Sequence, residues 1–109
     1  MTLPVSIAGR AEADLTHQYR WYPDHAGASV AEGFLMAFDG TVKRLSAQPE
    51  LGKRRRFRAQ ELSGMRSIAV GRPFAVHLVF YRAGAGVLSI ERVMHGAQNL
   101  PRRLLESPD

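Results

Sequence analysis

Cysteine is absent from the sequence, which excludes disulfide bonds and thiolate metal sites. Long apolar runs are missing as well, since none approaches the roughly 20 residues of a membrane-spanning helix. The N-terminal residues lack the basic segment and the apolar core of a signal peptide. These absences together predict a soluble, cytoplasmic protein that makes no contact with a membrane.

The sequence also lacks any strong catalytic motif. Its glycine-rich segments, GRPFAVH and GAG, lack the Lys-Ser/Thr pair and the following helix that a phosphate-binding loop requires. No Gly-x-Ser-x-Gly nucleophile elbow occurs. The four histidines are scattered, without the spacing of metal ligands: His17, His25, His77 and His95. The sequence therefore predicts neither a metal site nor a cofactor.

Positive charge is what the chain does carry. Its 109 residues, enough for one domain (1–109) with one core, include fifteen Lys and Arg against ten Asp and Glu, a formal net charge of +5. This balance favours an anionic partner, either nucleic acid or an acidic protein segment, although many small domains are basic only for solubility. The cations concentrate in two places: Lys53, Arg54, Arg55, Arg56 and Arg58, then Arg102 and Arg103. The first run is either a solvated loop or a binding surface.

The N-terminal half predicts a short strand followed by two helices. Apolar residues alternate over 3–7, and helix formers fill 10–22 until Pro23 ends the helix. The strongest helical pattern covers 26–45, although its two glycines cost about 1 kcal/mol each. The short link at 23–27 predicts an antiparallel helix hairpin. One face of the longer helix gathers its apolar residues: Val30, Phe34, Phe38, Val42 and Leu45.

The C-terminal half predicts a meander of strands. A loop at 46–64 holds most of the basic residues and has room for a short strand near 55–58. Period-two patterns then predict three strands, the middle one apolar on both faces and so covered on both sides, at 65–70, 74–82 and 87–94. The tail has room for a short helix at most. The fold class is therefore α+β, in the order β-α-α-β-β-β, with a small, mainly antiparallel sheet and the helix hairpin on one face.

Basic and aromatic residues near the strand ends are the candidates for chemistry: Arg66, Arg72, Tyr81, Arg82, Arg92 and His95. Arginines grip phosphates with two hydrogen bonds, and a histidine beside them moves protons in RNA cleavage. A structural role is open for each: Arg66 as the solvent end of a buried strand, Arg92 as a partner of Glu91, and His95 as the polar end of the last strand. Trp21 lies off the apolar stripe of its helix and is a candidate anchor for a partner.

Five segments occur in an order that resembles the ParE branch of the RelE/ParE toxin superfamily. That pattern opens with an Ala-x-x-Asp-Leu helix and a longer helix ending in Leu-x-x-x-Pro-x-x-Gly. An Arg-x-Ile-x-Val strand, an apolar strand ending in Tyr-Arg and a last strand ending in His-Gly follow. The match extends over nearly the whole chain, and its segments are Ala11–Leu15, Leu45–Gly52, Arg66–Val70, His77–Arg82 and Val93–Gly96.

The resemblance implies a toxin that an acidic, ParD-like antitoxin neutralises, with operator DNA bound only through the antitoxin. ParE-type members inhibit DNA gyrase by binding it and catalyse nothing, whereas RelE-type members are ribosome-dependent mRNA endonucleases. Carried over to this chain, the nuclease site consists of Lys53 or Arg54, Arg66 and His95. The tail after His95 lacks the Tyr, Phe or further His that such a nuclease uses, and His95-Gly96 resembles the ParE ending.

We therefore expect a gyrase-binding inhibitor that slows growth and stabilises plasmids, with an mRNA endonuclease of the RelE type as the alternative. A degenerate paralogue without toxicity is a third hypothesis, because a fold survives the loss of its target surface. The candidate residues for binding the target or the antitoxin are Trp21, Arg54, Arg55, Arg56, Arg66, Arg82, Arg102 and Arg103.

Overall fold

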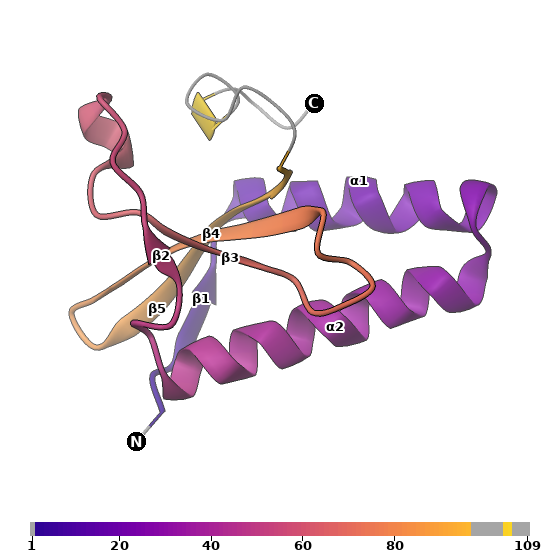
Figure 1. Cartoon of the computed structure of the whole chain (residues 1–109), viewed down its shortest axis with the longest axis horizontal. Coiled ribbons are helices and arrows are strands. Elements are labelled where there is room, and N and C mark those ends of the chain that lie inside the picture. The colour runs from indigo at the N-terminus through magenta and orange to yellow at the C-terminus, as the bar shows by residue number, and fades with distance from the viewer. Residues whose placement is uncertain (1, 97–103, 106–109) are drawn as a thin grey trace.

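Two antiparallel helices form a hairpin beside a five-stranded sheet in the computed structural model (Figure 1), which describes residues 2–96 and 104–105. Strand β1, Val5–Ile7, leads into helix α1, Gly9–His25, and helix α2, Ala28–Ala47, returns alongside it. The link consists of two residues, and Gly27 within it has a φ of +98°, a conformation that favours glycine. Neither helix is apolar over the length that crossing a membrane demands.

The first helix ends later than the sequence predicted. Pro23 lies inside α1 rather than terminating it, so the predicted boundary at 22 is wrong. The proline removes a single backbone donor close to the helix end, and the carbonyl of Tyr22 accepts from the N–H groups of both Ala26 and Gly27. The imidazole of His25 also bonds the carbonyl of Trp21. The positive φ of Gly27, and not the proline, stops the helix.

The strands form one mixed sheet in the order β1-β5-β4-β3-β2. Strand β1 runs parallel to β5, and the other neighbours are antiparallel, so the predicted α+β fold with its first strand paired to the meander is confirmed. The strands after the helices are β2, Lys53–Arg54; β3, Arg66–Ala69; β4, His77–Gly84; and β5, Val87–His95. Ala85 and Gly86 both have positive φ, which matches the tight hairpin turn between β4 and β5.

The short strand expected near 55–58 lies instead at Lys53–Arg54, so that boundary is wrong. A strand of two residues is too short to show an alternating apolar pattern, so the sequence gives no signal for it. The strand is defined by its pairing with β3. A 3-10 turn, η1 (Gln60–Leu62), completes the segment before β3. The predicted short C-terminal helix falls in a tail that lies almost wholly outside the described residues.

Both faces of the sheet are covered, as predicted for the central strand. Toward the helices, Val79 and Tyr81 of β4 pack with the apolar stripe of α2, which is buried as expected except for the half-buried Val30. Toward the other face, Phe80 packs with a smaller cluster under the loop of η1: Leu62, Met65, Met94 and Leu104. A shift in register between β4 and β5 makes Glu91 an extra residue, so that Ile90 and Val93 both face the helices.

Candidate functional site: a basic sheet edge and an aromatic pocket

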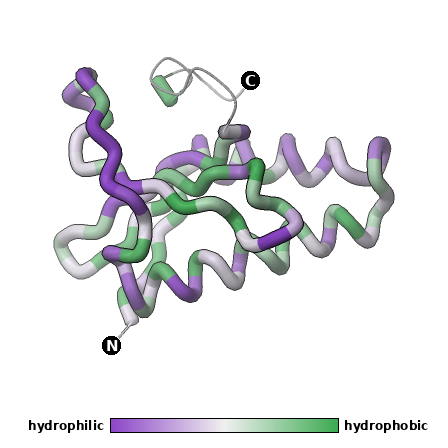
Figure 2. The backbone as a smooth tube through the Cα atoms, viewed as in Figure 1, coloured by the Kyte–Doolittle hydropathy of each residue, from purple (hydrophilic) through white to green (hydrophobic). Residues whose placement is uncertain are grey.

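The last strand of the sheet order, β2, presents a basic edge to solvent. Four cations of this segment are exposed: Lys53, Arg54, Arg56 and Arg58. Arg55 differs, because its guanidinium lies 5.5 Å from the ring centre of Phe57 and 5.7 Å from that of Phe80. Figure 2 shows this segment as the hydrophilic border of the molecule, beside the more apolar sheet. We call residues 53–58 the basic edge; its exposed side chains can contact an anionic partner.

Buried hydrogen bonds hold the turn that leads into the basic edge. The hydroxyl of Tyr81 donates to the carbonyl of Pro49 and accepts the N–H of Gly52, both at 2.8 Å. Burial raises the pKa of Tyr81, while the Gly52 hydrogen bond and the charge of Arg66 oppose the rise. A Cβ at position 52 would lie 2.4 Å from the Tyr81 hydroxyl, so only glycine fits there. Arg66 donates to the carbonyls of Glu50 and Gly52, at 3.3 and 2.8 Å, and so also fastens this turn.

Arg82, another predicted binding residue, is committed to the loop of η1. Its guanidinium donates to the carbonyls of Ser63, at 2.9 Å, and Glu61. It also forms an ion pair with Glu91 at 3.4 Å. About a third of the side chain stays exposed, so Arg82 positions the covering loop and offers one edge to a partner.

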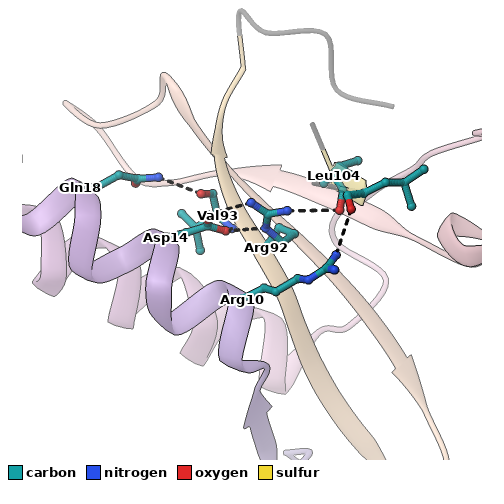
Figure 3. Close-up of polar contacts among 7 residues, drawn as sticks. Arg10, Asp14, Gln18, Arg92, Val93 and Leu104 are labelled. Atoms are coloured by element: carbon teal, nitrogen blue, oxygen red, sulfur yellow. Dashed lines mark hydrogen bonds and ion pairs between the residues drawn. The ribbon is translucent and has the colours of Figure 1, made fainter. Parts of the chain in front are cut away.

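Arg92 forms the central buried ion pair of the molecule, which Figure 3 shows between α1 and β5. It is 4 % exposed and makes two parallel bonds to Asp14, Nε to Oδ2 at 2.8 Å and Nη2 to Oδ1 at 3.0 Å. Asp14 also accepts the N–H of Val93 at 3.0 Å, and Arg92 donates to the carbonyl of Leu104 at 3.2 Å. The expectation that Arg92 pairs with Glu91 or grips phosphate is therefore wrong, because Asp14 holds its guanidinium away from solvent.

The residues of the nuclease alternative are spread over the sheet. Arg66 pairs with Tyr81, whereas His95 pairs with His77, four residues along the same strand. Four residues of a β-strand span about 13 Å. Lys53 pairs with the residue after Arg66, so strand alternation places its side chain on the opposite face, whereas Arg54 pairs with Arg66 itself and lies on the same face. Arg54 and Arg66 are therefore neighbours, but His95 does not converge with them on a single phosphate.

His95 lies instead at a pocket between α1 and the adjoining ends of β4 and β5. The cavity has a volume of about 400 Å³. Helix α1 contributes His17, Gln18 and Trp21 to its lining, and the strands contribute His77, Met94 and His95. The rings of His77 and His95 lie 6.2 Å apart, edge to face. The described residues nevertheless contain no group of three or more acidic, histidine or cysteine side chains able to hold a metal ion.

His77 is a buried polar group of this pocket, beside the Asp14–Arg92 pair, and the sequence analysis did not single it out. It is 6 % exposed, and its Nε2 lies 2.6 Å from the Tyr22 hydroxyl. Burial, followed by the nearby His95, lowers the pKa of His77 to about 4, so the ring is neutral at pH 7. Burial raises the pKa of Tyr22, which keeps its proton. The available signal was a lone histidine at the start of a strand that is apolar on both faces.

Trp21 stands at the rim of the pocket and is 50 % exposed, as expected for a residue off the helix stripe. Its ring stacks on His25 with centres 4.0 Å apart and an angle of 4° between planes. The neighbouring Tyr22 instead packs edge-on against Phe74 and lies tilted against Phe34 of the core. The two adjacent aromatic residues thus have different environments, one facing solvent and one the core.

The comparisons with known proteins agree with this fold. The family model of the ParE toxin of the type II toxin–antitoxin system parDE matches residues 5–100. The chain belongs to the ParE toxin family. No curated protein sequence matches it.

Two solved structures are similar to this ParE-family chain. One is the chromosomal ParDE toxin–antitoxin system from P. aeruginosa, with a TM-score of 0.70 and 20 % identity, covering 86 % of this chain and 96 % of that one. The other is the toxin–antitoxin complex RelBE2 from Mycobacterium tuberculosis, with a TM-score of 0.52 and 26 % identity, covering 87 % and 99 %. The fold is therefore that of the ParE and RelE toxins.

Within this ParE-family fold, the predicted binding residues fall into three groups. Most of the basic edge and Trp21 are exposed, and Arg66 and Arg82 are tied to backbone carbonyls. Arg102 and Arg103 lie outside the described residues. Among the predicted binding residues that the structure describes, those of the basic edge and Trp21 therefore offer the most exposed side chains to a partner.

Proposed function

We propose that this chain is the toxin of a type II toxin–antitoxin pair and that it acts by binding and inhibiting DNA gyrase. The observation that carries the proposal is the distance of His95 from Arg54 and Arg66 within a chain of the ParE family. Arg66 donates hydrogen bonds to the backbone of the turn beside it, and His95 lies at a pocket beside helix α1. This arrangement supports action by binding rather than cleavage of RNA, which needs its acid, base and phosphate-binding groups around one substrate.

The proposed neutralising partner is an acidic, ParD-like antitoxin, through which operator DNA is also bound. The net charge of +5 and the exposed cations of the basic edge favour an acidic chain. Both similar structures are described as toxin–antitoxin systems or complexes, which supports a partner of this class. A segment that folds as it binds can cover large parts of so small a toxin.

Supercoiling of relaxed plasmid by purified gyrase with ATP tests the proposal. We expect the folded chain to abolish supercoiling and to accumulate cleaved plasmid, and the cognate antitoxin to restore the activity. The variants Arg66→Ala and His95→Ala, if folded, are expected to stay toxic in cells.

Unchanged supercoiling by a folded preparation would contradict gyrase as the target. Translating ribosomes with an end-labelled message are then the second assay. Message cleavage that is lost in both Arg66→Ala and His95→Ala would establish the endonuclease alternative instead.

A further inference from the structure

The pocket between α1 and the ends of β4 and β5 has a rim of two exposed apolar side chains. Trp21 is 50 % exposed, Val76 is 53 % exposed, and both line the cavity of about 400 Å³. Tyr22, Val93 and Met94 add apolar wall below this rim. A tryptophan beside a well-formed cavity is typical of the positions that dominate protein–protein affinity, because an inserted side chain is shielded from water on all sides.

We propose that this pocket takes one apolar anchor side chain from an acidic segment of the antitoxin. The inference rests on the proposed function and names a docking site for its neutralising partner. This site is separate from the basic edge, since no residue of 53–58 lines the cavity. The antitoxin would thus be held in two ways, by charge at the sheet edge and by an apolar anchor beside α1.

The described cavity lining leaves no unpaired carboxylate that would repel an acidic segment. The titratable residues of the lining are three imidazoles, of His17, His77 and His95, and the ion pair of Asp14 and Arg92. Asp14 is already taken up by Arg92, so the described lining offers no second carboxylate to a Lys or Arg of a partner. Carboxylates beside the anchor would instead meet a chain whose net charge is +5. A second copy of this basic chain is repelled by the same charge.

Two buried polar atoms at the cavity have no hydrogen-bond partner among the described residues, Gln18 Oε1 and His77 Nδ1. The amide nitrogen of Gln18 donates to the carbonyl of Val93 at 2.8 Å, which leaves its oxygen as an unused acceptor. The side chain of His77 is only 6 % exposed, so its Nδ1 has little access to solvent. Buried polar groups are nearly always satisfied in folded proteins, so two unsatisfied atoms in one pocket point to a missing partner. Main-chain groups beside the anchor side chain would supply that partner after a small rotation of Gln18.

A matched pair of surface variants tests the docking site. Val76→Glu adds bulk and negative charge at the rim, and Met36→Glu makes the same change on α2, where Met36 is 74 % exposed and does not line the cavity. Calorimetry measures the affinity of each variant for the purified cognate antitoxin. We expect Val76→Glu to weaken binding by roughly tenfold or more and Met36→Glu to bind as the parent chain does. Thermal unfolding of both variants checks that they fold alike.

Trp21 provides a second readout because it is the only tryptophan in the sequence. In a ¹⁵N-labelled chain, its single indole N–H signal should move when unlabelled antitoxin binds. Equal affinities of the two variants, or an unmoved indole signal, would overturn the docking site while antitoxin binding, and with it the proposed function, stands. Absence of antitoxin binding to the parent chain would remove both. A dimer of the free chain that Val76→Glu dissociates would assign the pocket to a second copy and overturn the inference.

Discussion

Arg92 is 4 % exposed and donates hydrogen bonds to both Asp14 and the carbonyl of Leu104 (Figure 3), whereas Arg54 at the sheet edge is exposed to solvent. Both are arginines on strands of the same sheet. Arg92 joins helix α1, strand β5 and Leu104 into one unit, and Arg54 belongs to a surface that can meet a partner. The number of cations in the sequence therefore does not define a binding surface. The burial and the ion pairs of each cation decide whether it can contact a partner.

Removing Asp14 is expected to have the largest effect, because it leaves the charge of Arg92 buried and unpaired. Asp14→Ala should lower the free energy of unfolding by about 3–5 kcal/mol. Urea denaturation measures the loss. The control is Asp39→Ala, which breaks an exposed pair with Lys43 at 2.9 Å and should cost less than about 1 kcal/mol. Similar losses in the two variants would show that the buried pair does not hold the fold together.

A substitution in the turn before the basic edge is expected to lower the free energy of unfolding by the next largest amount. In Gly52→Ala the new Cβ would lie 2.4 Å from the Tyr81 hydroxyl and 2.9 Å from the carbonyl of Ser67, so the backbone must shift. We expect a loss of about 1–3 kcal/mol in the free energy of unfolding. Gly71→Ala is the control, since no atom lies within 4 Å of its Cβ. Equal midpoints of thermal unfolding for the two variants would refute this account of position 52.

The helices and strands with a periodic apolar pattern were predictable from the sequence. The apolar period of α2 predicted the residues that it buries, and the alternation after residue 65 predicted the meander. The strand that was misplaced lacks a period, because β2 is only two residues long. The last strand was predicted nearly to its bounds, but the bulge at Glu91 within it has no sequence signal. Pro23 was read as a helix stop, but a proline at the helix end costs one bond while Gly27 sets the turn.

The candidate site was less predictable because its contacts join residues far apart in the chain. Asp14 and Arg92 are 78 residues apart, and no local pattern distinguishes Arg92 from an exposed arginine. Tyr22 and His77 are 55 residues apart and meet only once α1 lies against the sheet. Exposure of Trp21 was predictable, since its place off the helix stripe is a property of α1 alone.

Burial also separates the histidines, as it does the arginines. His77 is buried in the folded chain, whereas the same side chain is solvated when the chain unfolds. Its pKa is lowered to about 4 from 6.5, so between these values the unfolded chain binds up to about one more proton. Stability is then expected to rise with pH through this window, and to fall as the pH drops from 6.5 towards 4. Urea denaturation at pH 4.5 and pH 7 measures the difference. His77→Gln should flatten this dependence, whereas the exposed His25→Gln should leave it in place.

Charge reversal at the basic edge is expected to have the smallest effect on the fold and a distinct effect on kinetics. The double variant Arg54→Glu/Arg56→Glu should slow association with the cognate antitoxin by about tenfold at low salt, because exposed charges act mainly by steering the encounter. The difference in association rate should shrink at physiological salt, where interactions between exposed charges are largely screened beyond about 8 Å. Stopped-flow mixing measures both rates, and Arg20→Glu, an exposed reversal on α1, is the control. If the double variant and the control associate at the same rate, the basic edge is a solvated border and the antitoxin approaches elsewhere.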